Sequence, residues 1–263
     1  MRKVFALDYI GETVQCYAII ASSEHYEGDD SEKQWAHDVL TRYFEVTEAE
    51  EVISRAKEVF DAIPNRVNGD RIPYRRDLSE KTVSFDSFKA LSKRRRSVRW
   101  FEDKPVPREL LFQAMDAARE APSACNRQPF VFRAFDEPQM VRKVASVPYG
   151  TVGYSDNIPT IVVVVGQMRN YFDERDRHLI YIDGALAGMS FVLALETLGL
   201  SSCMINWPDI DANEVQMRRL LGLESDERPV FMIAAGFPDP DGLVANSTKK
   251  SVNELLIFPS DDR

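Results

Sequence analysis

The residues best suited to chemistry form a short basic run. Residues 93–99 read Lys-Arg-Arg-Arg-Ser-Val-Arg, with five positive charges in seven positions. Guanidinium groups and a serine hydroxyl can bind a phosphate through charge-assisted hydrogen bonds. Taken alone, the run is more typical of a solvated helix end, where cations complement the helix dipole. A nuclear-localisation or nucleic-acid patch is a third interpretation, which one isolated run supports only weakly.

A second polar cluster lies in residues 121–130, which read Ala-Pro-Ser-Ala-Cys-Asn-Arg-Gln-Pro-Phe. Asn126 and Gln128 offer amide donors and acceptors, and Ser123 offers a hydroxyl. Such groups can bind the edge of a planar heterocycle, and the two prolines restrict the backbone that holds them. Loop capping explains single residues of this pattern but not the whole of it. Cys125 within it has two interpretations, a reactive thiol and a small packing residue, of which we predict the second.

The sequence lacks the motifs of several enzyme classes. It contains no G-x-G-x-x-G, no Walker loop and no H-E-x-x-H. The nearest approach to a nucleophile elbow, residues 188–192, lacks the closing glycine. His25, His37 and His178 show no metal-ligand spacing, so each is predicted to be a surface or packing residue and no metal is expected. Any catalysis is therefore expected to come from a bound group.

Composition limits the classes of binding partner and the cellular compartment that fit the sequence. Lys and Arg number 33 against 42 Asp and Glu in 263 residues, a net charge of −9, so the surface should repel nucleic acids and anionic membranes. The three cysteines, Cys16, Cys125 and Cys203, form no C-x-x-C pair and exclude a disulfide scaffold. Asp8 and Glu12 interrupt the first apolar run, so no signal peptide is expected. The sequence therefore predicts a cytoplasmic protein.

The elements that position the two clusters fall into two regions. Residues 1–83 are polar and irregular and are predicted to be an N-terminal extension of unknown role. Within it we expect weak strands at 4–7 and 14–21, helices over 32–45 and 48–63, and a linker over 64–73. A capping box of Thr47 and Glu50 is predicted to open the second helix.

Residues 84–263 are denser and more regular, and they predict an α+β domain. Helices are expected from 85 into the basic run, from 108 to 121, over 179–200 and over 214–221, and strands over 131–135, 161–165, 202–206 and 230–235. The helix over 179–200 is apolar all round and is predicted to be wholly buried, with Gly184 and Gly188 pressed against another helix. Asp183 and Glu196 within it argue against a membrane span.

The order of these motifs resembles that of the flavin-dependent nitroreductases. The shared features are Arg-Arg-Ser-Val-Arg-x-Phe from residue 95, Pro-Ser-Ala-x-Asn-x-Gln-Pro from residue 122, Asp183-Gly184, Leu198-Gly199-Leu200, and a late Ala-Ala-Gly-Phe-Pro followed by Lys-Lys. The likeness covers residues 84–257 and leaves residues 1–83 outside. It implies a central, mainly antiparallel sheet flanked by helices, in an intertwined homodimer with FMN at the subunit interface.

The resemblance also implies which residues bind FMN. One subunit supplies Arg95, Arg96, Ser97 and Arg99, with Arg95 at the phosphate and Arg99 near the flavin N1/O2 edge. The other subunit supplies Pro122, Ser123, Asn126 and Gln128. Lys249 and Lys250 return to the phosphate, and the backbone at Asn206 and Trp207 lies near flavin N5.

Two positions depart from the family pattern. Many relatives carry a glycine where Trp207 falls, so a flavin contact there requires that the indole point away and only the backbone N–H be used. Lys249 and Lys250 replace an arginine pattern, which keeps the charge but loses the bidentate fork.

The resemblance therefore predicts an FMN-dependent oxidoreductase. NADH or NADPH would reduce the flavin at N5, and a small electrophile such as a nitroaromatic or quinone would take the electrons. A biosynthetic dehydrogenation or a reductive dehalogenation fits the same fold. Two alternatives stay open: a flavin-binding or flavin-consuming protein of this fold without NAD(P)H turnover, and a non-enzymatic module that binds a phosphorylated ligand.

Overall fold

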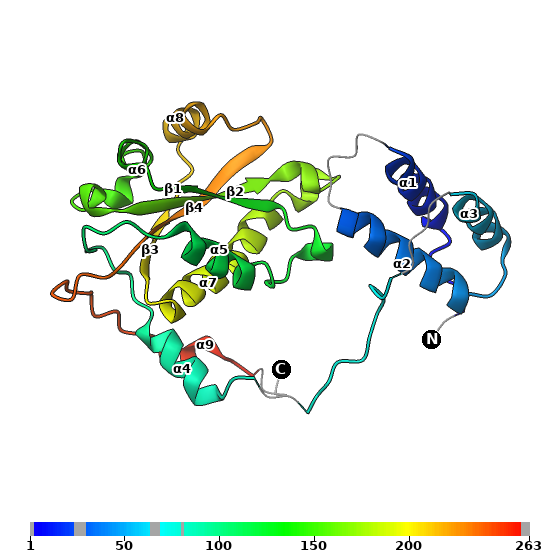
Figure 1. The fold of residues 1–263 in the computed structure, drawn as a ribbon, viewed down its shortest axis with the longest axis horizontal. Helices are drawn as coiled ribbons and strands as arrows, with labels where there is room; N and C mark the ends of the chain where they lie inside the picture. The colour runs from blue at the N-terminus through cyan, green and yellow to red at the C-terminus, as the bar shows by residue number, and fades with distance from the viewer. Residues whose placement is uncertain (1–2, 24–29, 64–68, 80–81, 259–263) are drawn as a thin grey trace. The chain divides into compact units, whose positions relative to one another are not determined.

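The computed structural model describes residues 3–23, 30–63, 69–79 and 82–258. The chain divides into two compact units, Met1–Lys81 and Thr82–Arg263 (Figure 1). Each unit has a hydrophobic core of its own. Both polar clusters of the sequence lie in the larger unit.

The described residues of the smaller unit form three helices: α1 (Ile10–Ser22), α2 (Asp30–Val46) and α3 (Glu51–Asp61). Ile10, Val14 and Tyr17 recur every three or four residues on α1 and pack with α2 and α3 in one core. The predicted helices are thus confirmed as α2 and α3. The predicted strands at 4–7 and 14–21 are wrong, since the first run forms no strand and the second belongs to α1. Helical spacing of the apolar residues outweighs their β-branching.

The start of α3 differs from the predicted capping box. Glu50 is the N-cap, and its carboxylate accepts a hydrogen bond from the Val52 amide at 2.8 Å. Thr47 instead donates its hydroxyl to the Tyr43 carbonyl at 2.9 Å. A glutamate thus takes the role predicted for the threonine. Of the predicted linker, residues 64–68 lie outside the described residues, and 69–73 form no helix or strand.

The larger unit is built on a four-stranded antiparallel sheet in the order β1-β2-β4-β3. The strands are β1 (Phe130–Phe135), β2 (Thr160–Gln167), β3 (Ser201–Asn206) and β4 (Glu227–Gly236). The four predicted strands are confirmed, each slightly longer than its apolar run. β1 and β3 are therefore the two edges of the sheet, and β2 and β4 form its centre.

Helices cover both faces of this sheet, as Figure 1 shows. The helices are α5 (Arg108–Ala118), α6 (Pro138–Ala145), α7 (Leu179–Thr197) and α8 (Asp211–Leu221). Alternate residues of β2 serve the two cores: Ile161 and Val163 pack with α6 and α8, while Val162 and Val164 pack with α5 and α7. Burial on both faces explains the continuous apolar run of β2. The predicted α+β class with a helix-flanked antiparallel sheet is confirmed.

Helix α6 is absent from the sequence prediction. It has only eight residues, and Glu137 caps it by accepting hydrogen bonds from the amides of Gln139 and Met140. The Glu-Pro pair at its start was the available signal, because proline favours the first turn. The remaining helical segments within residues 82–258 are α4 (Phe85–Arg94), α9 (Val252–Leu255) and five 3₁₀ turns at 124–126, 149–151, 155–157, 168–170 and 174–176.

The glycines of α7 face the sheet, which corrects the expectation that they press against another helix. A Cβ built at Gly188 lies 2.3 Å from the Phe231 ring of β4, and one at Gly184 lies 3.4 Å from Val164 of β2. Glycine at 188 thus lets α7 approach the sheet closely. Residues 174–197 are the one segment in the described ranges that is long and apolar enough to cross a membrane, but half of that stretch is buried in the protein.

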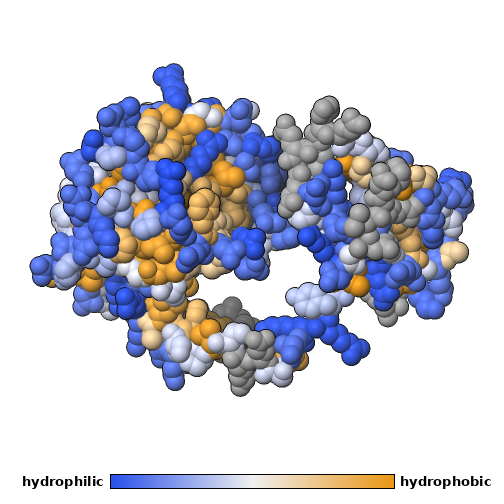
Figure 2. Space-filling view, in the orientation of Figure 1, coloured by the Kyte–Doolittle hydropathy of each residue, from blue (hydrophilic) through white to orange (hydrophobic). Residues whose placement is uncertain are grey.

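Helix α7 is also not wholly buried, contrary to the sequence prediction. Its Tyr181, Ile182, Leu186 and Met189 are 40–49% exposed and lie on the face away from the sheet. Figure 2 shows further hydrophobic side chains at the surface of the larger unit. An apolar stripe of this kind on a single chain is typical of a surface that a partner covers.

Candidate functional site

The basic run ends α4 and continues along an edge of the sheet. Arg95 is the C-cap of α4, and its amide donates to the Leu91 carbonyl at 3.0 Å. Ser97 bridges Ser202 of the edge strand β3, where the Val98 amide donates to the Ser202 carbonyl at 3.0 Å. The sheet edge thereby fixes the backbone of the run.

One arginine of the run has a structural partner. Arg94 donates to Glu196 of α7 with an Nε–Oε2 distance of 3.4 Å. Glu196 is buried, and the Ser201 hydroxyl also donates to it at 3.1 Å. A buried carboxylate requires such partners. Arg94 therefore anchors the end of α4 to α7.

The following cations have no such partner. Arg95, Arg96 and Arg99 form no ion pair with a carboxylate among the described residues, unlike Arg108, Arg133 and Arg169 elsewhere in the larger unit. The Arg99 guanidinium lies 5.7 Å from the centre of the Tyr154 ring. Burial, followed by the neighbouring Cys203 thiol, raises the pKa of Tyr154, so the phenol stays neutral beside Arg99. The segment thus presents uncompensated positive charge that suits a small anion.

The polar cluster at 122–128 forms a loop with unusual backbone angles. Cys125, Asn126 and Gln128 have φ values of 53°, 54° and 47°, in the left-handed region that glycine prefers. Each such residue costs about 1 kcal/mol or more. Inside the loop, the Gln128 amide donates to the Ser123 hydroxyl at 3.0 Å, and the Gln128 side chain donates to the Asn126 carbonyl at 3.3 Å. Strain of this kind persists where surrounding contacts impose it. We call residues 122–128 the amide loop.

A buried carboxylate of α7 holds the start of the amide loop. Asp183 is 3% exposed, and its Oδ2 accepts hydrogen bonds from the Ala124 amide at 3.1 Å and from the Tyr171 hydroxyl at 2.6 Å. Burial and the hydrogen bond to Asp183 both raise the pKa of Tyr171, so this phenol remains a donor. The sequence singled out Asp183 as part of a shared motif and as an argument against a membrane span, but not as a support of the loop, and it gave no signal for Tyr171.

The end of the amide loop is tied to the same neighbouring segment. Arg127 donates to the Asn170 carbonyl at 2.8 Å, and the Asn170 side chain donates to the Arg127 carbonyl at 3.0 Å. The Arg127 guanidinium also lies 5.7 Å from the centre of the Tyr171 ring. Sequence reasoning missed these contacts, since no motif links residues 127 and 170. Residues 170–171 therefore support the loop at both ends.

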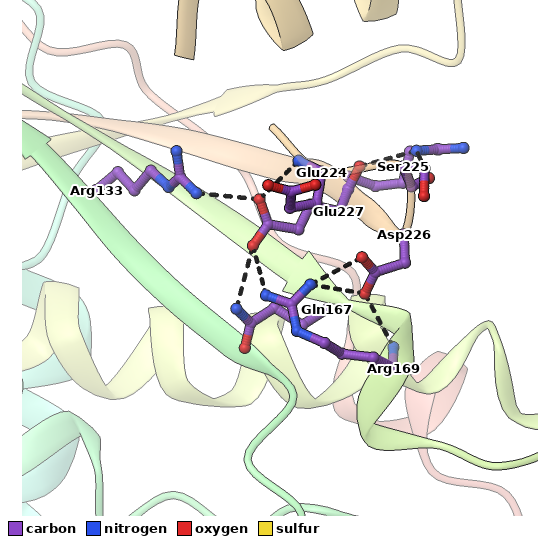
Figure 3. A network of polar contacts seen from close by, with 8 residues as sticks. Arg133, Gln167, Arg169, Glu224, Ser225, Asp226 and Glu227 are labelled. Carbon is purple, nitrogen blue, oxygen red and sulfur yellow. Dashed lines mark hydrogen bonds and ion pairs between the residues drawn. The ribbon is translucent and has the colours of Figure 1, made fainter. Parts of the chain in front are cut away.

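Segment 168–170 is fixed in turn by a network of ion pairs (Figure 3). Arg169 reaches Asp226 at 2.8 Å and the buried Glu227 at 2.8 Å. Arg133 of β1 and Gln167 of β2 also donate to Glu227, at 3.0 and 3.2 Å. Burial raises the pKa of Glu227, but the hydrogen bonds from Arg169 and Gln167 outweigh burial and hold it below its usual value. The network joins β1, β2, β4 and the segment that holds the loop.

The amide loop and the basic run lie at diagonally opposite corners of the sheet. The loop leads into β1, whose Phe130 pairs with Gly166 near the end of β2. The basic run bridges Ser202, which lies in register with Thr160 at the start of β2 through Ala235 of β4. Six residues of strand correspond to about 20 Å. Asp183 and Glu196 of α7, which contact the two clusters, are also about 20 Å apart along the helix. A single chain therefore does not bring the two clusters together.

The end of β3 lies on the same sheet edge as the basic run. Asn206 is exposed there. The Trp207 side chain is only 8% exposed and packs in the core under α6 and α8, where its indole N–H donates to Glu214 of α8. The indole thus points into the protein, which is the arrangement that a backbone-only contact requires.

The two lysines at 249 and 250 lie on the chain beyond β4. This segment leaves the sheet beside the basic run, since the Asp239 amide donates to the Trp100 carbonyl at 3.1 Å. Lys249 and Lys250 are exposed, and among the described residues neither pairs with a carboxylate. The structure places them in a segment without helix or strand before α9.

The remaining candidate residues that the structure describes do not assemble a second site. Cys125 is exposed on the amide loop, which corrects the prediction of a packing residue. His37 is a buried packing residue stacked on Phe60, and His178 precedes α7, while His25 lies outside the described residues. In the described ranges, no cluster of three or more His, Cys, Asp or Glu could hold a metal ion.

Known proteins similar to this chain include both reductases and dehalogenases. A protein of Methanothermobacter thermautotrophicus, provisionally named NADH dehydrogenase/NAD(P)H nitroreductase, is 28% identical over 61% of this chain and 82% of its own length. Iodotyrosine deiodinase 1 of Mus musculus is 22% identical over 82% of this chain and 83% of its own. The FMN-dependent nitroreductase of Clostridium difficile R20291 shares the fold with a TM-score of 0.56, at 21% identity over 65% of this chain and 98% of that structure.

The family model described as "Nitroreductase family" matches residues 92–152 and 149–237, more than half of the chain. The match begins within α4 and includes the basic run, the amide loop and all four strands. Residues before 92 lie outside it, as expected of an N-terminal extension. The chain therefore belongs to the nitroreductase family of oxidoreductases, which confirms the resemblance predicted from its motifs.

Proposed function

We propose that the chain is an FMN-dependent oxidoreductase that acts as a homodimer, with each flavin held between two subunits. It takes electrons from NADH or NADPH and passes them to a small electrophilic acceptor of the nitroaromatic or quinone class. The observation that carries the proposal is the diagonal separation of the amide loop from the basic run. Two clusters about 20 Å apart in one chain can serve one cofactor only if a second copy completes the site.

The residues present fit FMN. Arg95, Arg96 and Arg99 carry charge that no described carboxylate neutralises, which suits a phosphate and an electron-rich ring edge. The amide loop carries Asn126 and Gln128 on a strained backbone held from outside, which suits recognition of a flat heterocycle. The buried Trp207 side chain leaves the backbone near it available as a donor.

The exposed apolar stripe of α7 supports the homodimer. Tyr181, Ile182, Leu186 and Met189 form a continuous surface on the helix that links the two clusters. Phe85 and Phe88 of α4 are also more than half exposed. A second copy of the chain that covers these surfaces would bring its amide loop toward the basic run of the first.

Each group of residues then has a definite role. When bound, FMN supplies hydride transfer at N5 between the nicotinamide and the acceptor. Arg95 and Arg96 bind its phosphate, and Arg99 places positive charge near the N1/O2 edge, where it stabilises negative charge on the ring. Asn126 and Gln128 of the other subunit orient the ring. No acid, base or nucleophile of the chain is required for the transfer.

Reductive removal of a halogen is a second candidate for the acceptor half-reaction. The match to the mouse iodotyrosine deiodinase covers 82% of the chain, so it extends beyond the larger unit into residues 1–81. The match to the archaeal nitroreductase-like protein covers 61%. Because the deiodinase match extends into the smaller unit, halogenated phenols should be tested as acceptors beside nitroaromatics and quinones.

The test is spectroscopic. Purified protein should be yellow with bound FMN, and NADH or NADPH added without oxygen should bleach it. Reoxidation by nitroaromatics, quinones and halogenated phenols, followed by stopped flow, then ranks the acceptors. Protein that neither carries nor binds FMN would contradict the proposal. Bound FMN that neither nicotinamide reduces would favour a flavin-binding protein without NAD(P)H turnover.

A further inference from the structure

The contact between Asp183 and the amide loop is unusual for a buried acid. The side chain is 3% exposed, and no cation in the described part of the chain forms an ion pair with it. Its Oδ2 is instead satisfied by two neutral donors, the Ala124 amide and the Tyr171 hydroxyl. An aspartate buried without a counter-ion is costly, so packing alone does not explain its presence.

Both donors belong to the support of the loop. Ala124 directly precedes Cys125 and Asn126, the first two residues of the loop with left-handed backbone. Tyr171 follows Asn170, which exchanges two hydrogen bonds with Arg127 inside the loop. The carboxylate thus joins the start of the strained stretch to the segment that holds its end.

We propose that Asp183 is a positioning residue for cofactor binding, acting through Tyr171 and the Ala124 amide. It holds the amide loop in the left-handed conformation that presents Asn126 and Gln128 to the flavin of the other subunit. Without it the loop relaxes, and the fold of the sheet persists. This inference rests on the proposed function.

The support requires an acceptor oxygen and not the negative charge itself. The two donors converge on one oxygen atom, Oδ2. An asparagine at this position retains such an oxygen with two lone pairs, whereas alanine retains none. Asp183→Asn should therefore preserve the loop, and Asp183→Ala should release it. Tyr171→Phe removes one donor and leaves the other.

The experiment compares these three variants of the full chain with Tyr43→Phe as a matched control. Tyr43 donates its hydroxyl to the Phe5 carbonyl at 2.8 Å in the smaller unit, so its loss costs a similar hydrogen bond away from the loop. We expect the FMN dissociation constant to rise about tenfold in Asp183→Ala and a few-fold in Tyr171→Phe. Asp183→Asn should stay within about threefold of the parent. A fourth variant that combines Asp183→Ala with Tyr171→Phe should bind FMN only slightly less tightly than Asp183→Ala, because both changes remove the same support of the loop.

Hydrogen exchange provides a readout that needs no cofactor. In flavin-free protein, amides in residues 124–128 should exchange faster in Asp183→Ala than in the parent or in Tyr43→Phe. Unchanged exchange and unchanged FMN affinity in a folded Asp183→Ala would overturn the inference. So would an equal loss of FMN affinity in Tyr43→Phe. If the parent itself binds no FMN, the proposed function fails, and that outcome is distinct from any difference among the variants.

Discussion

The amide loop and the basic run show two ways in which a chain prepares a binding site. The loop carries three strained residues and is held by Asp183, Tyr171 and Asn170. The basic run bridges the edge of β3, but after Arg94 its guanidinium groups have no carboxylate partner in the described chain. The amide loop therefore has a strained backbone that hydrogen bonds within the chain hold in place. The basic run has no left-handed residue, and its arginines after Arg94 lack a carboxylate partner among the described residues.

This difference indicates how each cluster contributes to binding. A loop fixed before the ligand arrives loses little conformational entropy on binding, so it contributes geometry and specificity. Unpaired arginines at a surface contribute attraction for an anion and lose mobility when it binds. The site thus divides orientation and affinity between two clusters, which we propose lie on different subunits.

Mixing two defective subunits tests this division and has the largest expected effect. Arg95→Ala removes a cation from one cluster. Asn126→Gly removes an amide from the other while tolerating its φ of 54°. Each homodimer should retain little FMN. A mixed dimer contains one site with both defects and one with neither, so about half of the parental FMN should return.

Differently tagged copies that are expressed together and purified through both tags provide the mixed dimer. The FMN content per dimer is measured from flavin absorbance after denaturation. Pairing each variant with a second tagged copy of itself is the control for purification. If mixed dimers hold no more FMN than either variant homodimer, the two clusters do not combine across subunits into one site, and the proposed division between them is wrong.

Residue type alone was enough to single out the cations and amides of both clusters as candidates, and the pattern of apolar residues was enough to predict the four strands. The support of the loop was beyond sequence reasoning, because Asp183 and Ala124 are 59 residues apart and meet only in the fold. The strained φ values were also hidden, since Cys125 and Gln128 have no preference for left-handed backbone. The glycines of α7 were assigned to the wrong partner, because close approach to a sheet and to a helix have the same sequence pattern.

The next largest effect is expected when the ion pairs of Arg169 with Asp226 and Glu227 are removed. Arg169→Met leaves the buried Glu227 with fewer donors and frees segment 168–170, so we expect a loss of about 1.5 kcal/mol in unfolding free energy at neutral pH. Hydrogen bonds from Arg169 lower the pKa of Asp226 and of Glu227 against the opposing effect of burial. Their stabilisation is therefore present above the pKa values of the unfolded chain and is lost as pH falls through the lower folded values.

Arg169→Met should flatten this acid dependence, because it removes the cause of the lowered pKa values. Urea unfolding of both proteins at several pH values measures the effect. Arg175→Met is the matched control, since Arg175 pairs with Asp176 at 3.5 Å and its side chain is 70% exposed. Such a pair contributes little. An equal loss in both variants would mean that the network does not support the loop end of the sheet.

The smallest expected effect concerns Trp207. This residue lies on the same sheet edge as the basic run, but its side chain is fixed by core packing and by a hydrogen bond to Glu214. Trp207→Phe keeps an aromatic ring in the core and removes the indole N–H that donates to Glu214. We expect a loss of about 1 kcal/mol in unfolding free energy. The FMN dissociation constant should not change, because the proposed site uses only the backbone at this position. Glu214→Gln retains an acceptor for the indole and should change neither quantity. A tenfold weaker FMN affinity in a folded Trp207→Phe would place the indole itself in the site.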